Sequence, residues 1–347
     1  MARVGVVGIG FMGWIHYLAY KKVRGLDLAA IHTRSPKKLQ GDWRGIKGNF
    51  GPPGEVVNLK NIAAHETYEA MLADDSLDLI DICLAPNQHF EFALAALKAG
   101  KHVLIEKPIT LEVSQAKKLQ QEAAKRNLQL LTAHVLPFFV EFNYLLKVAR
   151  EGKFGKLLGG NFRRVISNPT WIPDFFDPDK VGGPLLDLHI HDAHFIRLLF
   201  GMPEGVSSVG RMRGEVVEYC TTQFEYPTEN YAVTATSGVL NQPARAFAHG
   251  FEVHFEQATV MFDFAVIDDE PRLIMPLTVM PAKGKSKVPK LKAGDPVDAF
   301  VQELKEVNAS LESGQTSDIL GGDLAVDALV LCQKQAESVV KGKRVKV

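Results

Sequence analysis

Residues 3–13 of the chain, RVGVVGIGFMG, join a short apolar run to several closely spaced glycines. Gly8, Gly10 and Gly13 form a G-x-G-x-x-G pattern between a predicted strand and a helical pattern, the context in which this motif indicates dinucleotide binding. The first glycine permits a tight turn, the second lets the backbone approach a pyrophosphate, and the third allows close packing of helix on strand. N–H groups at the start of the helix then face the anion. A purely structural glycine turn is the alternative. The residues expected to contact the cofactor here are Gly8, Gly10, Phe11, Met12 and Gly13.

The alternation of strand and helix patterns continues beyond this motif. From Arg3 to about Ala133, apolar runs of strand length alternate with helical patterns. The apolar residues of these runs are consecutive, as burial on both faces of a parallel sheet requires. After Lys156, longer alternating segments with few helices between them predict a mostly antiparallel sheet. The sequence therefore predicts an α/β protein with two domains, a doubly wound parallel sheet of Rossmann type in residues 1–133 and a second domain in residues 134–347.

The composition argues against several classes of partner. The 347 residues carry 40 basic and 40 acidic side chains, so the formal net charge is zero and no overall field favours nucleic acid or an anionic membrane. No apolar run is long enough to span a bilayer, and the strand-like start of the chain leaves no room for a signal peptide. The cysteines lie far apart in apolar surroundings, which indicates buried reduced thiols and a cytoplasmic protein. They are Cys83, Cys220 and Cys332.

The end of the second predicted strand bears on the choice between NAD and NADP. An acidic residue about twenty positions beyond the glycine motif would hold the ribose 2′-hydroxyl of NAD. Residues 32–38, HTRSPKK, contain none. Thr33, Arg34 and two lysines suit a 2′-phosphate instead, which favours NADP over NAD. Alternatively, Arg34 stacks on the adenine or points into water.

Two more strand ends project residues to the same carboxyl edge of the sheet, where open α/β folds bind ligands. Residues 85–89, APNQH, end one strand, and Asn87 is expected to cap the next helix, to lie beside the nicotinamide, or both. Glu106-Lys107-Pro108 ends the following strand, and the proline keeps Lys107 in an extended conformation. A solvated lysine is the default at such a place. Beside an oxidised nicotinamide, however, positive charge and loss of water would lower the pKa of Lys107 toward the range of proton transfer.

Residues 182–195, GGPLLDLHIHDAHF, place several histidines in one predicted helix. On a helical wheel Asp187, His191 and His194 share one stripe, whereas His189 lies nearly opposite. The three histidines cannot all bind one ion on such a helix, so we expect no metal, although Asp187 and the two stripe histidines leave a divalent ion as an alternative. An Asp–His pair one turn apart suits proton transfer, because the carboxylate influences the orientation and basicity of the imidazole. A buried structural pair is the other alternative.

Taken in order, these segments resemble the glucose-fructose oxidoreductase, inositol dehydrogenase and MocA (Gfo/Idh/MocA) family of NAD(P)-dependent dehydrogenases over essentially the whole chain. VVGIGFMG, APNQHFEFALAALKAGKHVLIEKPIT, GGPLLDLHIHDAHFIRLLFG and the closing SVVKGKRVKV are each similar to the corresponding family segment. E-K-P and D-x-x-x-H are the most specific elements. The resemblance implies a Rossmann domain and an α/β domain with a large, open, mostly antiparallel sheet. It also implies a homodimer or homotetramer.

Carried over residue by residue, the resemblance assigns catalytic roles to Lys107, to Asp187 as the residue that orients the substrate, and to His191 as the residue that exchanges a proton with the reacting hydroxyl. It implies hydride transfer between the nicotinamide and a secondary alcohol or ketone carbon of a sugar, polyol or related compound. Besides the glycine turn, the residues expected at the cofactor are Thr33, Arg34, Pro86, Asn87, His89, Glu106 and Lys107. Those expected at the substrate are His134, Trp171 and His194.

The chain also departs from the family pattern near the expected substrate pocket. The family often has glycine in place of His189, aspartate in place of His194 and arginine in place of Pro137, so the familiar sugars do not transfer to this chain. Trp171, with Phe175 and Phe176, could form an apolar wall over a sugar ring or pack beneath a loop. Two other functions remain open, a lyase or glycosidase that retains its cofactor and uses transient oxidation, and a non-catalytic dinucleotide-binding regulator.

Overall fold

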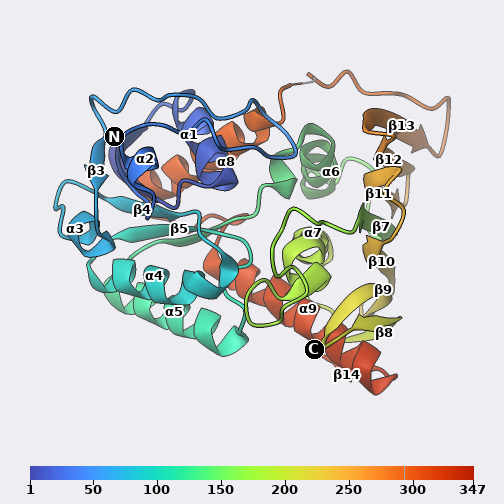
Figure 1. The fold of residues 1–347 in the computed structure, drawn as a ribbon. Helices are drawn as coiled ribbons and strands as arrows, with labels where there is room; N and C mark the ends of the chain where they lie inside the picture. Colours follow the sequence, from blue (N-terminus) through green and yellow to red (C-terminus); the bar gives the residue numbers. More distant parts are fainter. Residues whose placement is uncertain (293) are drawn as a thin grey trace. The chain divides into compact units, whose positions relative to one another are not determined.

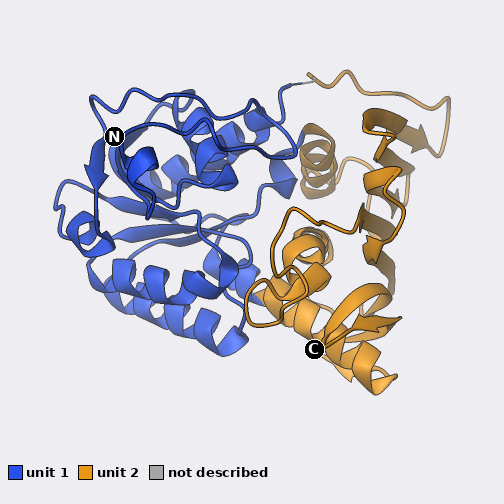
Figure 2. Ribbon diagram, in the orientation of Figure 1, with its two compact units in different colours: residues 1–139, 293–326 blue, residues 140–292, 327–347 orange. Residues whose placement is uncertain are grey.

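The computed structural model describes residues 1–292 and 294–347, which divide into two compact units (Figure 2). The first unit contains residues 1–139 and 294–326, and the second contains residues 140–292 and 327–347. Residues 294–326, which follow residues 140–292 of the second unit in sequence, thus pack within the first unit. The sequence predicts a domain boundary between residues 133 and 134. It stays a prediction, because the compact units do not show which parts of the chain fold independently.

The first unit is built on a six-stranded parallel sheet, which confirms the predicted Rossmann-type architecture. The strand order is β3-β2-β1-β4-β5-β6, so the order reverses between β1 and β4, where doubly wound sheets bind their ligands. Val4, Val6 and Val7 of β1 are almost fully buried, as expected for a strand covered on both faces. The strands are β1 (Ala2–Val7), β2 (Leu26–His32), β3 (Ala63–His65), β4 (Leu79–Ile82), β5 (His102–Glu106) and β6 (Leu130–Ala133).

Helices cover both faces of this sheet (Figure 1). Helices α4 (Pro86–Lys98) and α5 (Val113–Arg126) lie on one side, whereas α1 (Phe11–Tyr20) and α8 (Val297–Ser313) pack together on the other. Helix α8 comes from the C-terminal part of the chain, and its Phe300 ring lies 6.0 Å from the His16 ring of α1. The shorter helices of the unit are α2 (Pro36–Leu39), α3 (Tyr68–Leu72) and the 3-10 turn Leu136–Phe138.

The second unit is built on an eight-stranded sheet with the order β13-β12-β11-β7-β10-β9-β8-β14. Its neighbouring strands are antiparallel except for β7 and β10, which run parallel, so the predicted mostly antiparallel sheet is confirmed. The strands are β7 (Leu157–Ser167), β8 (Gly205–Arg213), β9 (Val216–Tyr226), β10 (Tyr231–Leu240), β11 (Arg245–Phe255), β12 (Ala258–Ile267), β13 (Glu270–Pro281) and β14 (Val345–Lys346).

Helices α6 (Val140–Arg150), α7 (Ile190–Phe200) and α9 (Gly322–Lys341) complete the chain. The segment that the sequence predicts as one α-helix begins with a π-helical turn, Leu185–His189, before α7. A π turn spaces its side chains differently from an α-helix, and the predicted stripe of Asp187, His191 and His194 stays a prediction across this junction. None of the helices in the described parts of the chain is long and apolar enough to cross a membrane. All three cysteines are buried free thiols, as predicted.

Candidate functional site

The glycine turn between β1 and α1 has the geometry that a pyrophosphate needs. Gly8 has φ +92°, and a Cβ there would lie 2.6 Å from the Cys83 carbonyl oxygen. A Cβ on Gly13 would lie 2.2 Å from the Gly8 carbonyl oxygen, so this position requires glycine for close packing. A Cβ on Gly10 would instead meet nothing within 4 Å. Open space therefore lies at Gly10, directly before the first N–H groups of α1, and the turn fits a bound dinucleotide.

Among residues 1–292 and 294–347, no side chain caps the start of α1, and the first turn of the helix holds no acidic residue. The oriented N–H groups there keep their capacity to bind an anion. Phe11, the first residue of the helix, turns its ring toward the glycine-rich segment 41–54: a Cβ on Gly48 would lie 1.8 Å from that ring. The rings of Phe11 and Phe50 lie 5.0 Å apart, and the Trp14 indole donates a 2.8 Å hydrogen bond to the Pro52 carbonyl. The segment thus packs on the N-terminal half of α1, a contact that the sequence patterns do not indicate.

The end of β2 presents basic groups, as predicted. Arg34 and Lys37 are exposed, and Thr33 is half-buried. Lys38 reaches back to the glycine turn, where its Nζ donates a 2.6 Å hydrogen bond to the Ile9 carbonyl oxygen. Burial lowers the pKa of Lys38. The sequence contains a local indication of this contact. Ser35 caps the short helix α2, and this cap sets the direction in which Lys38 projects from the helix.

At the end of β4 the structure corrects one prediction. Ala85 is the N-cap of α4 and Pro86 its first residue, so Asn87 lies inside the helix and is not its cap. Proline fits the first position because the N–H that it lacks has no partner within the helix. Asn87 is exposed, and its expected place beside the nicotinamide stays a prediction.

His89, predicted at the cofactor, is fully buried between backbone carbonyls. Its Nδ1 lies 2.7 Å from the Pro108 oxygen, and its Nε2 lies 3.0 Å from the Leu84 oxygen. Burial lowers the pKa of His89, so the ring is neutral near pH 7. The ring therefore joins the end of β4 to the turn that contains Lys107. Direct contact between His89 and the cofactor stays a prediction.

The end of β5 holds the Glu106-Lys107-Pro108 turn, in which the Lys107–Pro108 peptide bond is cis. Glu106 is buried, and its Oε2 accepts a 3.1 Å hydrogen bond from the backbone N–H of Lys107. Lys107 itself is half-buried. His134, after β6, is buried within this unit. All predicted cofactor residues and Lys107 therefore lie at the carboxyl edge of one sheet.

The second unit holds Asp187 and His191. Both are half-buried, Asp187 in the π turn and His191 in the first turn of α7. His189 and His194 are buried, so His194, expected at the substrate, has no surface to offer in this structure. Burial lowers the pKa of His189, and the nearby Arg164 acts in the same direction. A π turn is common at functional sites, and here it redirects the side chains that precede α7.

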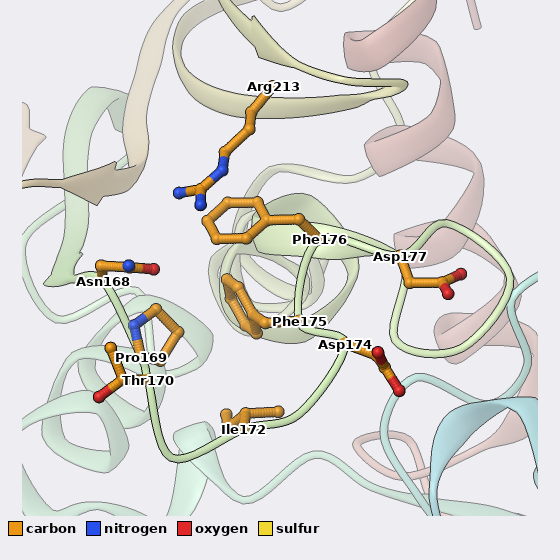
Figure 3. A pocket seen from close by; sticks show the side chains of 9 residues that line it. All are labelled: Asn168, Pro169, Thr170, Ile172, Asp174, Phe175, Phe176, Asp177 and Arg213. Carbon is orange, nitrogen blue, oxygen red and sulfur yellow. The ribbon is translucent and has the colours of Figure 1, made fainter.

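The loop before this helix lines an open surface pocket of about 430 Å³ in the second unit (Figure 3). Figure 3 shows the Arg213 guanidinium over the Phe176 ring, and the two lie 3.8 Å apart. Phe175 belongs to a buried cluster that includes Leu188 of the π turn, so the loop packs directly on the turn that carries Asp187. Trp171 is 52% exposed. The residues that line the pocket are Asn168, Pro169, Thr170, Ile172, Asp174, Phe175, Phe176, Asp177 and Arg213.

A buried polar cluster in the first unit was not foreseen from the sequence. His16, Asp81 and Cys83 place a nitrogen, an oxygen and a sulfur atom within 4.8 Å of one another. The separations are those of hydrogen bonds, 2.8 Å from His16 Nδ1 to Asp81 Oδ2 and 3.5 Å from that nitrogen to Cys83 Sγ. Hydrogen bonding therefore accounts for the arrangement. The sequence gives no spacing signal for it, because His16 lies on α1, whereas Asp81 lies on β4 and Cys83 directly after that strand.

Comparison with known proteins covers both units. A family model described as "Oxidoreductase family, NAD-binding Rossmann fold" matches residues 2–134, and the "GFO/IDH/MocA C-terminal domain" matches residues 142–261. Myo-inositol 2-dehydrogenase from Thermotoga maritima is 28% identical over 201 residues, which make up 57% of this chain and 55% of the relative. Trans-1,2-dihydrobenzene-1,2-diol dehydrogenase from Sus scrofa is 34% identical over 152 residues, 43% of this chain and 44% of the relative. The matches span about half the length of these curated relatives.

Solved structures agree on the fold. Levoglucosan dehydrogenase, in a complex with NADH and L-sorbose, superposes with a TM-score of 0.80 at 17% identity. The match covers 100% of this chain and 98% of that one, so the same two-sheet architecture extends over the full length of both. At this identity the likeness concerns the fold alone.

Proposed function

The chain belongs to the GFO/IDH/MocA family of oxidoreductases, and from this premise we propose that it is an NAD(P)-dependent dehydrogenase. It transfers a hydride between the nicotinamide and a secondary alcohol or ketone carbon of a sugar, polyol or related compound. The observation that carries the proposal is the open space at Gly10 before an uncapped helix, on the same sheet edge as Lys107. The relatives named as dehydrogenases of inositol and of a dihydrodiol support a CH–OH group as the site of reaction.

When bound, the nicotinamide cofactor accepts or donates the hydride. The glycine turn and the first N–H groups of α1 bind the pyrophosphate. His191 takes the proton of the reacting hydroxyl at an imidazole nitrogen, or returns it in the reverse direction, and Asp187 orients the ring and the substrate. The Lys107 ammonium donates hydrogen bonds at the reacting oxygen and thereby stabilises negative charge that develops there. These are the catalytic roles proposed for Lys107, Asp187 and His191.

The cofactor is proposed to be NADP in preference to NAD. Arg34 and Lys37 are exposed beyond β2, no acidic residue stands there, and Lys38 adds a positive charge at the glycine turn. These groups complement a 2′-phosphate and offer no acceptor for a 2′-hydroxyl. Thr33 and Arg34 are therefore proposed as the residues that recognise the ribose.

The substrate is proposed to meet the second unit, near Asp187 and His191. Phe176, with Arg213 stacked on it, and the exposed Trp171 supply the aromatic surface that a sugar or polyol ring requires. His134 and His194 stay among the residues proposed to contact the substrate. Both are buried, so the protein must move before either side chain can reach a substrate. We also propose a homodimer or homotetramer, because the strands of the large sheet carry exposed apolar side chains such as Val209 and Leu273. The buried free thiols support a reducing, cytoplasmic compartment.

The first experiment is a melting curve of the purified protein with NADP⁺, NAD⁺ or neither, because a ligand that binds the folded state raises its apparent stability. NADP⁺ should raise Tm more than NAD⁺. Polyols and sugars are then screened as substrates, and reduction of the nucleotide is followed by its absorbance. Failure of both nucleotides to shift Tm, in protein that also holds no nucleotide as purified, would refute the proposal. Bond cleavage without net reduction of the nucleotide would identify a lyase or glycosidase instead.

A further inference from the structure

His16 lies in the interior of the first unit, between two carboxylates from different strands. It belongs to α1, three residues beyond Gly13, and is fully buried. Its Nδ1 lies 2.8 Å from Oδ2 of Asp81, which is on β4. Its Nε2 lies 3.3 Å from Oε1 of Glu106, the last residue of β5. The second contact is an ion pair and not a hydrogen bond, because neither atom has a hydrogen-bond partner among the described residues.

The surroundings of the ring decide its charge. A neutral imidazole would turn a lone pair toward one of the two carboxylates, whereas an imidazolium presents an N–H to each. Tyr20 of α1 donates a 2.9 Å hydrogen bond to Asp81, and the Cys83 thiol lies 3.5 Å from Nδ1. Burial opposes the charge on the ring, but Asp81 and Cys83, through charge and hydrogen bonds, together outweigh it and raise the pKa of His16 well above its usual range.

Helix α8 closes the other side of the cluster. Glu303 is fully buried there, and in the described part of the chain neither of its carboxylate oxygens has a hydrogen-bond partner. Burial raises the pKa of Glu303 well above its usual range; the charge of His16 opposes this shift, and Glu106 and Asp81 add to it. Burial likewise keeps the Cys83 thiol protonated. Asp81 and Glu106 are acidic side chains in direct contact with the ring.

The cluster continues to the backbone of the lysine. The Glu106 oxygen that does not face His16, Oε2, accepts the 3.1 Å hydrogen bond from the Lys107 N–H. We propose that His16 is a positioning residue, which as an imidazolium held by Asp81 fixes the Glu106 carboxylate and, through it, the backbone from which Lys107 extends. The helix whose first turn binds the pyrophosphate thereby sets the orientation of the lysine. This inference rests on the proposed function for its catalytic consequence but not for its geometry.

A metal ion is the competing explanation for these ligand types. Two ligands of one tetrahedral zinc stand about 3.3 Å apart, given metal–ligand distances near 2.0–2.1 Å. The 2.8 Å separation of His16 Nδ1 and Asp81 Oδ2 is that of a hydrogen bond instead. Metal analysis of the purified protein is therefore part of the test, and a stoichiometric transition metal would overturn the proposal.

The geometric part is tested without catalysis. A nitrogen NMR titration of the wild-type protein, with His16 assigned through the backbone, should show the ring doubly protonated well above pH 7. Hydrogen exchange of the Lys107 N–H should be slow in the wild type and faster in His16→Gln. Tyr20→Phe is the matched control on the same helix, because it removes one hydrogen bond to Asp81 but leaves the ring between its carboxylates. A His16 pKa near its ordinary value, or equal exchange of the Lys107 N–H in all three proteins, refutes the positioning role of His16. This conclusion holds even if the enzyme proves inactive.

The catalytic part uses a double-mutant cycle. His16→Gln should lower kcat by about 10²-fold, the loss typical of a reacting group displaced by about 1 Å, while the Kd for the nucleotide changes little. Since His16 acts only through Lys107, the double variant His16→Gln, Lys107→Ala should be no slower than Lys107→Ala alone. Losses that multiply would show a general structural role and overturn the proposal. If no substrate turns over in the wild type, the proposed function fails. The titration and exchange data still decide whether His16 positions the backbone of Lys107.

Discussion

Arg164 of β7 holds Asp192 of α7 in a buried, two-point ion pair. Its Nε donates to Asp192 Oδ2 at 2.7 Å and its Nη2 donates to Oδ1 at 3.1 Å, with 6% and 2% of the two side chains exposed. Asp192 follows His191 directly in the chain. The planar guanidinium fixes the carboxylate in two directions, so the sheet sets the rotation of α7 and with it the direction in which His191 projects.

We expect Asp192→Ala to destabilise the protein strongly, because it leaves the Arg164 charge buried without its partner. The loss should be about 3–5 kcal/mol of the free energy of unfolding, measured by denaturant titration. Asp263→Ala is the control on the same sheet: Asp263 pairs with Arg163 at 2.6 Å, but with 44% of the Arg163 side chain exposed. That loss should be about 1 kcal/mol or less. Equal losses for the two variants would contradict the assigned role of burial.

Gly10 and Gly13 should respond differently to the same added methyl group. In Gly10→Ala the new Cβ lies in open space, so the unfolding of the nucleotide-free protein should change little, whereas nucleotide affinity should fall by about tenfold or more, roughly 1.4 kcal/mol. In Gly13→Ala the Cβ meets the Gly8 oxygen at 2.2 Å, so the protein itself should be destabilised. Calorimetric binding and thermal melts separate the two effects. If Gly10→Ala binds nucleotide normally, the pyrophosphate does not bind at this turn.

Arg34→Ala should weaken NADP⁺ binding by about tenfold or more while leaving NAD⁺ binding nearly unchanged, since hydrogen bonds to a charged group contribute about 1.5–3 kcal/mol. Arg44→Ala is the matched control, because the exposed Arg44 guanidinium already pairs with Asp42 at 2.9 Å. The Kd values for both nucleotides are measured by fluorescence titration. A parallel loss of both affinities in Arg34→Ala would assign Arg34 to the adenine rather than to the 2′-phosphate.

The buried Glu303 predicts how stability depends on pH. Its pKa is raised above the ordinary value of 4.5, so the folded protein keeps a proton that the unfolded chain releases. Its contribution to stability is therefore fully present below pH 4.5 and decreases as the pH rises toward the folded-state pKa. Glu303→Gln removes this titration. The Tm of Glu303→Gln relative to wild type should increase from pH 5 to pH 8, and a difference that is constant with pH would contradict the buried neutral carboxyl.

Much of the fold could be predicted from local patterns. Consecutive apolar runs indicated the parallel sheet, alternating runs indicated the antiparallel one, and the glycine spacing indicated the turn at Gly8. The π turn that holds Asp187 could not be predicted, because α-helical and π-helical turns contain the same kinds of apolar and polar residues. Pro86 took the first helical position and displaced the expected cap from Asn87 to Ala85, which shows that proline outweighed a capping side chain here.

The clusters that depend on distant contacts also escaped prediction. His16, Asp81, Glu106 and Glu303 come from four elements, and each alone fits an ordinary helix or strand. Their proximity follows from the strand order and from the return of α8 to the first sheet, neither of which leaves a periodic signal in the chain.

Segment 41–54 has a consequence for the kinetics of nucleotide binding. Its ring and backbone contacts with Phe11 and Trp14 are made between residues of the chain itself, so we expect the glycine turn to hold its shape before a nucleotide arrives. Association then requires no ordering of the chain at this point, and the entropy that a mobile loop would lose is absent from the binding free energy. The nucleotide should bind as to a rigid surface, in one kinetic phase whose rate rises linearly with its concentration.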